Sequence, residues 1–223
     1  MRRCDLAIIG SGPGGYVAAL YAASHKLKVC LIEKNELGGT CLNRGCIPTK
    51  SMLYAANLFS QTLQSSRFGI EAPSCSLNFE KVISRRDEVV SRLRAGIGTL
   101  LKARGVEFIK GEAGFIGPSA LSVSGEEIVC ANIIIAAGSV PSYDRLFKVD
   151  ETSILTSDGM LNIRELPRSL AIVGGGVIGC EFASLYNLMG VKVTVIETAD
   201  RILPSFSPIS PPTKEIPLTA LVE

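Results

Sequence analysis

Two cysteines near the start of the chain stand at a spacing that suits redox chemistry. Cys41 and Cys46 are five positions apart in a glycine-rich segment, and Pro48 follows directly. Positions i and i+5 of an ideal helix lie roughly 8–9 Å apart, beyond the limit of about 7 Å between the Cα atoms of a disulfide. We therefore predict that Cys41 precedes a regular helix and that Cys46 begins it. Pro48 supports this, because proline is tolerated in the first turn of a helix.

The predicted position of Cys46 favours thiol chemistry. The positive end of a helix stabilises a thiolate, so Cys46 is expected to take part in thiol exchange. Lys50 follows one helical turn later, where its ammonium group could reach the same ligand region; the alternative is an ordinary surface charge. Two reduced, buried structural cysteines are the alternative for the pair. The other five of the seven cysteines stand singly in apolar surroundings, which is typical of a protein from a reducing compartment.

One sequence pattern occurs twice in the chain. It consists of a predicted strand, a glycine turn, a helix, and a second strand that ends in an acidic residue. The first copy contains Gly10, Gly12, Gly14, Gly15 and Glu33, and the second contains Gly174, Gly176, Gly179 and Glu197. In both copies the acid stands 23 positions after the first glycine and 18 after the last. Such glycines allow a tight turn and close approach to a pyrophosphate, and the carboxylate accepts hydrogen bonds from a ribose. The repeat predicts two dinucleotide sites, although glycine turns also join strands to helices where nothing binds.

The strands that position these turns are short and continuously apolar. Examples are the ranges 6–9, 29–32, 133–137 and 193–196. Runs of this kind are typical of parallel strands buried on both faces, so we predict an α/β fold. A net charge of +2 favours neither a nucleic acid nor an anionic membrane as partner. No run of about eighteen apolar residues predicts a membrane span, and no residue pattern indicates a metal site.

The segment from Gly38 to Lys50 resembles the redox-active site of the flavoprotein disulfide reductases, and most of all that of the dihydrolipoyl (dihydrolipoamide) dehydrogenases. The resemblance implies a catalytic Cys41–Cys46 disulfide, in which Cys41 exchanges with the substrate and Cys46 lies next to the flavin. It also implies FAD at the first glycine turn and a nicotinamide cofactor at the second. Glu197 favours NAD over NADP, because a carboxylate at this position repels a 2′-phosphate.

The same resemblance implies further cofactor contacts. Those expected around FAD are Lys34, Gly39, Thr40, Lys50, Ala113, Ala137, Gly138 and Ser139. Those expected at the second turn are Val177, Ile178 and Glu181, of which Glu181 is expected to form an ion pair with Lys50. Simpler alternatives are surface charges for Lys50 and Glu181, and an ordinary turn after a core strand for residues 136–139.

We predict three regions in the chain. Residues 1–148 are expected to form the N-terminal part of a Rossmann-like FAD-binding domain with a three-layer, parallel sheet. Residues 149–206 are expected to form the first β-α-β unit of a second Rossmann-like, NAD-binding domain, and residues 207–223 an irregular tail rich in proline. The likeness covers residues 4 to about 206, whereas family members run to roughly twice this length and carry a later His-Glu acid/base pair. The sequence therefore resembles an N-terminal portion, for which we expect little activity alone.

The expected function of the complete family member is oxidation of protein-bound dihydrolipoyl groups, with electrons passed to NAD⁺. Its partners would be a lipoyl-bearing protein of a 2-oxoacid dehydrogenase or glycine cleavage complex, and a second copy in a homodimer. We expect a cytoplasmic protein, because the first strand begins by Cys4 and leaves no room for a leader peptide. Alternatives are a reductase of the glutathione, mercuric or trypanothione type, or an inactive nucleotide-binding remnant. The arginines between residues 85 and 94 are expected to form a solvated helix face.

Overall fold

The computed structural model describes residues 1–141, 147–204 and 219–221. The chain divides into two compact units, each assembled from two stretches of sequence. The first contains Met1–Pro48 and Asp87–Asp158, and the second contains Thr49–Arg86 and Gly159–Glu223. A six-stranded sheet belongs to the first unit and a three-stranded sheet to the second. The predicted domain boundaries after residues 148 and 206 stay predictions.

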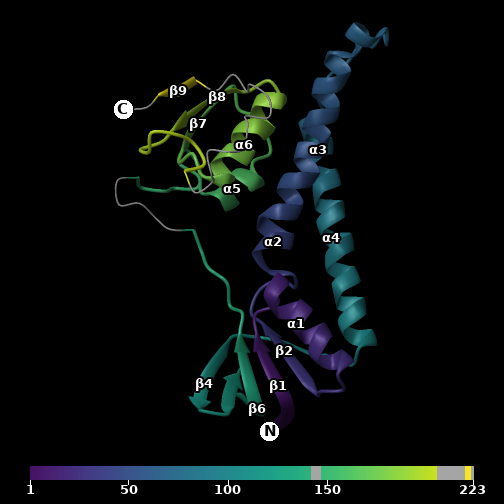
Figure 1. The fold of residues 1–223 in the computed structure, drawn as a ribbon, viewed down its shortest axis with the longest axis vertical. Coiled ribbons are helices and arrows are strands. Elements are labelled where there is room, and N and C mark those ends of the chain that lie inside the picture. The colour runs from purple at the N-terminus through teal and green to yellow at the C-terminus, as the bar shows by residue number, and fades with distance from the viewer. Residues whose placement is uncertain (142–146, 205–218, 222–223) are drawn as a thin grey trace. The chain divides into compact units, whose positions relative to one another are not determined.

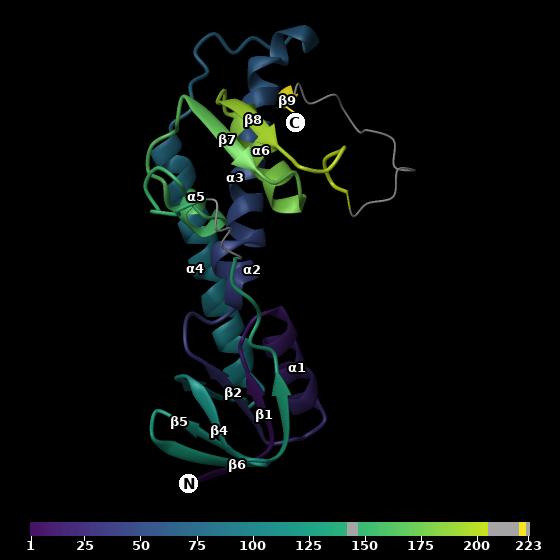
Figure 2. The same cartoon turned by 90° about the vertical axis from the view of Figure 1, so that its left-hand side faces the viewer.

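The sheet of the first unit places its strands in the order β3-β2-β1-β6-β5-β4 (Figure 1). Its elements are β1 (Arg2–Ile9), α1 (Pro13–Ser24), β2 (Val29–Glu33), β3 (Glu107–Lys110), β4 (Ala113–Gly117), β5 (Ala120–Val123) and β6 (Glu126–Ile135). The four strands β3, β2, β1 and β6 are parallel, which confirms the predicted α/β class. The sheet is nevertheless mixed, because short turns join β4, β5 and β6 as an antiparallel meander (Figure 2).

The strand register determines where a ligand site can form. Ile9 at the end of β1 pairs with Ile32 of β2 on one side and with Ile135 of β6 on the other. The carboxyl ends of three parallel strands therefore meet at one edge of the sheet. In open α/β sheets this edge is where ligands bind.

The two faces of this sheet are covered differently. On one face, Ile8 packs with Ala19 of α1 and with Leu101 of α4 (Phe79–Ala103). The small alanine lets the helix approach the strands closely. On the other face, Leu121 and Val123 of β5 join the cluster around the β1 and β2 side chains. Helices cover one side, and strands of the meander contribute the core on the other.

The cysteine segment forms two helices instead of one. Cys41 lies within a six-residue helix, α2 (Gly39–Arg44), and Cys46 is the first residue of α3 (Cys46–Leu63). Gly45 separates them with φ −146° and ψ −109°. The prediction that Cys46 begins a helix, with Pro48 in its first turn, is confirmed. The prediction that Cys41 precedes this regular helix is confirmed too. The short helix that contains Cys41 was not expected; a left-handed Gly38 (φ 102°) caps its start.

The second unit repeats the strand–helix–strand pattern on a smaller scale. Its sheet has the parallel order β7-β8-β9. The elements are β7 (Ser169–Val173), α6 (Val177–Leu188), β8 (Lys192–Ile196) and β9 (Thr219–Leu221), and a short helix α5 (Ser157–Asn162) precedes them. Of the tail predicted to be irregular, residues 207–218 and 222–223 lie outside the described residues. The strand β9 was not expected; it uses the backbone groups that the edge of β8 offers to another strand.

Two arginines of α4 are not part of a solvated face. Arg86 is only 5% exposed and donates a hydrogen bond to the carbonyl oxygen of Leu161. Arg94 is half-buried and contacts Asn43. The prediction is therefore wrong for these two and holds for Arg85 and Arg92, which are exposed. Helical spacing alone does not reveal that a long cationic side chain can reach a buried carbonyl or amide oxygen.

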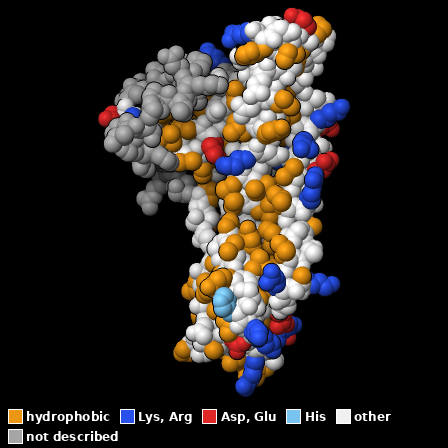
Figure 3. All heavy atoms as spheres, turned by 45° about the vertical axis from the view of Figure 1, so that its right-hand side comes forward, with side chains coloured by type: hydrophobic (Ala, Val, Ile, Leu, Met, Phe, Trp, Pro, Cys, Tyr) orange, Lys and Arg blue, Asp and Glu red, His pale blue; other side chains and the backbone are white. Residues whose placement is uncertain are grey.

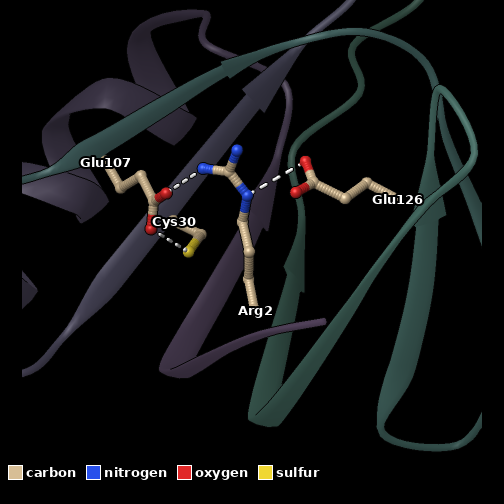
Figure 4. Close-up of polar contacts among 4 residues, drawn as sticks. All are labelled: Arg2, Cys30, Glu107 and Glu126. Carbon is tan, nitrogen blue, oxygen red and sulfur yellow. Dashed lines mark hydrogen bonds and ion pairs between the residues drawn. The ribbon is translucent and has the colours of Figure 1, made fainter.

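The surface carries both ionic and apolar features. At the start of β1, Arg2 lies between Glu107 and Glu126, with Nε of Arg2 3.0 Å from Oε2 of Glu126 (Figure 4). Hydrophobic side chains also reach the surface in many places (Figure 3). Examples are Ile135 and Val173, which are 67% and 58% exposed at the carboxyl ends of β6 and β7. Among the described residues, no helix is long and apolar enough to cross a membrane.

Two adjacent glycines of α1, Gly14 and Gly15, differ in the space available for a side chain. A Cβ atom on Gly15 would lie 1.8 Å from the carbonyl oxygen of Gly10, whereas one on Gly14 would meet only the Cβ of Ala136, at 4.0 Å. We expect Gly15→Ala to lower the free energy of unfolding by about 3 kcal/mol or more. Gly14→Ala is the matched control and should change it by less than about 1 kcal/mol. Urea denaturation followed by circular dichroism measures both, and equal effects would contradict the packing described.

Candidate functional site

The first glycine turn is packed too tightly for any side chain at its key positions. Gly10 has φ +99°, and a Cβ atom there would lie 2.2 Å from the carbonyl oxygen of Ala136. Gly39 has φ +63°, and its Cβ atom would lie 2.5 Å from the Cα of Gly12. Three segments therefore meet at one point: the turn after β1, the residues after β6 and the start of α2. This supports the prediction of a single site that includes Gly10, Gly12, Gly39 and the neighbouring Ala137.

A buried carboxylate holds this turn. Glu33, at the end of β2, is 8% exposed and accepts hydrogen bonds from the backbone N–H and the hydroxyl of Ser11 at 2.9 and 2.7 Å. Its other oxygen accepts the backbone N–H of Asn35 at 2.8 Å. Burial alone raises the pKa of Glu33, but the hydrogen bonds from Asn35 and Ser11 and the nearby Lys110 outweigh it and hold that pKa below its usual value. The carboxylate stays ionised and fixes the turn.

The second glycine turn repeats the backbone hydrogen bonds of this arrangement. Gly174 has φ +106°, and a Cβ atom on Gly179 would lie 2.0 Å from its carbonyl oxygen. Glu197 accepts the backbone N–H groups of Gly175 at 2.6 Å and Ala199 at 2.9 Å, the positions equivalent to Ser11 and Asn35. The hydrogen bond from Ala199 is the main reason that the pKa of Glu197 is lowered, followed by the one from Gly175. The predicted repeat thus extends to the hydrogen bonds.

Both turns lead into helices whose first N–H groups suit an anion. The residues that cap α1 and α6 are Gly12 and Gly176, which have nearly the same backbone angles (φ −64°, ψ −176° and φ −72°, ψ −175°). No side chain forms a cap hydrogen bond at either of these two helix starts. N–H groups at a helix start that lack a capping side chain favour phosphate oxygens, and the absence of Cβ atoms leaves room for close approach. The residues present fit the pyrophosphate of a dinucleotide at each turn.

The remaining residues predicted for the first site lie around this core in different ways. Lys34, which follows β2, forms an ion pair at 2.9 Å with Glu112, which precedes Ala113 of β4. Gly138 has φ +73° and open space around its Cα. Gly14, Thr40 and Ser139 are exposed. The structure brings these residues to the same unit as the glycine turn, and their contacts with a cofactor stay predictions.

The two cysteines and Lys50 lie on successive elements. Cys41 is half-buried on α2, and Cys46 is exposed at the start of α3. Both are thiols in this structure, so the disulfide between them stays a prediction. In the second unit, the Nζ atom of Lys50 lies 3.0 Å from Oε1 of Glu181, which confirms the predicted ion pair. Val177 and Ile178, at the start of α6, are 50% and 59% exposed, and their contact with a cofactor stays a prediction.

Three polar residues of the site were not predicted from the sequence: Ser11, Asn43 and Arg94. Ser11 joins two segments, since its hydroxyl donates to Glu33 and accepts the backbone N–H of Gly38 at 3.3 Å. Asn43 and Arg94 form a second junction, in which two nitrogens of Arg94 lie 2.9 and 2.6 Å from Oδ1 of Asn43. Ser11 could have been found as the small polar residue between two glycines of the turn. No local pattern points to Arg94, because it is 51 positions from Asn43.

Two matched glycine turns at the ends of parallel strands, with a pair of cysteines in the same unit as the first turn, are features of a Rossmann-like nucleotide-binding protein. The family model for pyridine nucleotide-disulphide oxidoreductases matches residues 4–212. The chain belongs to this family. The match extends slightly beyond residue 206, where the likeness was expected to end.

The chain is also similar to proteins named dihydrolipoyl dehydrogenase. It is 46% identical over 214 residues to one from Bacillus subtilis (strain 168) and 43% identical over 204 residues to one from Chlamydia trachomatis serovar D. These matches cover 90% and 89% of this chain but 45% and 44% of the relatives. The chain thus spans less than half the length of these two relatives.

Solved structures are also similar to this chain in fold. LpdA from Mycobacterium tuberculosis has a TM-score of 0.83 at 27% identity, over 92% of this chain and 46% of that one. The HOCl-induced flavoprotein disulfide reductase RclA from Escherichia coli has a TM-score of 0.77 at 35% identity, over 90% of this chain and 43% of that one. Both are similar in fold to the described residues as far as the match extends.

The carboxylate of Glu33 makes stability depend on pH in a definite direction. Because the folded pKa of Glu33 is lowered, its stabilising effect is complete above the pKa of an unfolded glutamate, about 4.3, and is lost as the pH falls through the lower folded value. We expect Glu33→Gln to cost about 1–3 kcal/mol of unfolding free energy near neutral pH, since an amide cannot accept at both ends. The difference from the native chain should shrink in acid.

Denaturation at a series of pH values measures this difference. The exposed Glu36→Gln is the matched control and should have little effect at any pH. A Glu33→Gln deficit that is the same at neutral pH and at about pH 3 would mean that the ionised carboxylate is not what holds the turn.

Proposed function

We propose that the chain provides the FAD site, the redox dithiol and part of the NAD site of a dihydrolipoyl dehydrogenase. The observation that carries this proposal is the contact between Gly39 and Gly12, which places the start of the cysteine-bearing helix against the first glycine turn. The names of the relatives support the same assignment. The proposed partner is a lipoyl-bearing protein of a 2-oxoacid dehydrogenase or glycine cleavage complex, and the proposed location is the cytoplasm.

The proposed chemistry begins with thiol exchange at the cysteine pair in its disulfide form. A thiolate of the dihydrolipoyl group attacks the sulfur of Cys41, the Cys41–Cys46 bond breaks, and Cys46 leaves as a thiolate. The second dihydrolipoyl thiol, once deprotonated, displaces Cys41, which closes the lipoyl disulfide and leaves both cysteines reduced. The two electrons now reside on the dithiol. FAD, when bound, supplies the two-electron acceptor between this dithiol and NAD⁺.

The chain's own residues have distinct roles in this proposal. Cys41 is the exchange thiol, and Cys46, at the start of α3, is stabilised as a thiolate by the helix. The helix starts at Gly12 and Gly176 bind the two pyrophosphates, while Glu33 and Glu197 fix the turns and accept hydrogen bonds from the riboses. Lys50, paired with Glu181, supplies a cation whose orientation is fixed. A glutathione- or mercuric-type reductase is the alternative within this class, and the carboxylate of Glu197 disfavours it.

A second candidate function, the binding of dinucleotides without turnover, has one observation in its favour. The chain contains one histidine, and His25 is exposed at the end of α1, where its Nδ1 contacts the carbonyl oxygen of Tyr21 at 3.0 Å. It serves as a helix end residue and not as a base for a dithiol. The chain alone could therefore bind dinucleotides without turnover, and a homodimer with the family's acid/base pair belongs to the proposal for a longer protein.

Flavin binding tests the main proposal directly. We expect the purified 223-residue chain to retain FAD with visible flavin absorbance, and reduction by dihydrolipoamide to produce a long-wavelength band from a thiolate next to the flavin. Cys46→Ser should abolish this band while FAD stays bound, and Cys41→Ser should retain a thiolate at Cys46. Absorbance spectra during titration with the dithiol measure both variants. Failure of the chain to bind added FAD would refute the proposed first site.

The carboxylate of Glu197 makes a prediction about the choice of nicotinamide. Glu197→Arg should shift the ratio of the NADPH and NADH dissociation constants toward NADPH by about tenfold or more, because a cation replaces a charge that repels the 2′-phosphate. Asp200→Arg is the matched control, since it makes the same charge change at an exposed position three residues later. The ratio is measured by nucleotide fluorescence titration. An equal shift in both variants would show a general charge effect and not recognition by residue 197.

A further inference from the structure

We propose that Arg94 and Asn43 form a clamp that positions the short helix α2, and with it Cys41, for bond formation with Cys46. The inference rests on the proposed function, because it concerns the same dithiol. It assigns a positioning role to two residues that lie outside the two glycine turns. Arg94 stands far along the chain on α4, and Asn43 stands between the two cysteines.

The amide of Asn43 is used at both ends. Its oxygen accepts from two nitrogens of Arg94, at 2.9 and 2.6 Å. Its nitrogen donates to the carbonyl oxygens of Gly39 at 2.9 Å and Leu37 at 3.1 Å. A guanidinium can only donate, so Arg94 determines which way the amide faces. The donor end is then directed at the two carbonyl groups where α2 begins.

The helix needs this support because it is short. Six residues form fewer than two turns, and isolated helices of that length are unstable in water. The residues after Cys41 each hold α2 to a different partner. The side chain of Leu42 is 5% exposed and packs against Gly38, Asn43 is held by Arg94, and Arg44 lies 3.7 Å from Asp158. Asn43 has the most hydrogen bonds of the three, and one partner is charged.

The clamp also connects the cysteine to the first glycine turn. Gly39, whose carbonyl oxygen accepts from Asn43, lies against Gly12, and Gly38 donates to the carbonyl oxygen of Ser11 at 3.1 Å. A displacement of α2 would therefore move the residues that touch the turn. The arrangement holds Cys41 in fixed relation both to Cys46, two residues beyond α2, and to the proposed FAD site.

Arg94 could instead be a tertiary contact with no bearing on the thiols, and a redox equilibrium separates the two cases. The reaction is protein dithiol plus glutathione disulfide giving protein disulfide plus two glutathione molecules, so one bond is gained and one is lost. A clamp that holds Cys41 in place raises this equilibrium constant, because it increases the effective concentration of one protein thiol near the other. A contact that only stabilises the fold leaves this constant unchanged in the folded chain.

The experiment compares variants of the 223-residue chain in glutathione buffers, with the disulfide fraction read by alkylation and mass spectrometry. Arg94→Met keeps the aliphatic stem and removes the donors, and should lower the constant about tenfold, the usual effect of losing hydrogen bonds from a charged group. Arg94→Lys keeps one donor and should lower it less. Arg92→Met, at an exposed position on the same helix, is the control and should leave it unchanged.

Each outcome decides between the proposals. If Arg94→Met and Arg92→Met give the native constant, the clamp is refuted while the dithiol function stands. If the native chain itself forms no Cys41–Cys46 bond, the proposed function fails, and the inference fails with it. If Arg94→Met loses helical circular dichroism, the Arg94→Lys variant decides. An equilibrium constant below the native value supports the clamp, and a constant equal to the native value refutes it.

Discussion

A carboxylate that accepts backbone N–H groups is the interaction on which both nucleotide turns depend. A glycine turn has few conformational restraints of its own, because glycine loses more freedom on folding than any other residue. Glu33 compensates for this by accepting hydrogen bonds from the backbone N–H groups of Ser11 and Asn35. Ser11 follows β1, and Asn35 follows β2. The turn is thereby fixed before any ligand arrives, and the first N–H groups of α1 are directed to a constant position.

The two copies of this interaction differ in ways that matter for binding. Glu33 is buried and also accepts the hydroxyl of Ser11, so much of its hydrogen-bonding capacity is used within the protein. Glu197 is half-exposed and has a glycine, Gly175, at the position equivalent to Ser11. The second carboxylate therefore presents more of its surface to a ligand. A rigid first turn suits a permanently bound cofactor, and a more open second turn suits a nucleotide that enters and leaves.

Local sequence predicted most of the fold but not the contacts between distant segments. The repeated glycines and acids at fixed spacing predicted both strand–helix–strand units, because each part of that pattern has a local cause. The pairing of Lys50 with Glu181 came from family resemblance. The contact of Arg94 with Asn43 has neither a local cause nor a motif, and only the packing of α4 beside α2 reveals it.

The break at Gly45 explains why the cysteine segment needs support from outside itself. A single continuous helix would have held Cys41 rigidly, but at a distance from Cys46 too large for a disulfide. The break at Gly45 removes this restriction, but it leaves the first helix only six residues long. The stability lost in this way has to be supplied by side-chain contacts from Leu42, Asn43 and Arg44. In the proposed redox segment, residues that have no redox chemistry of their own, such as Arg94, would therefore hold the short helix in place.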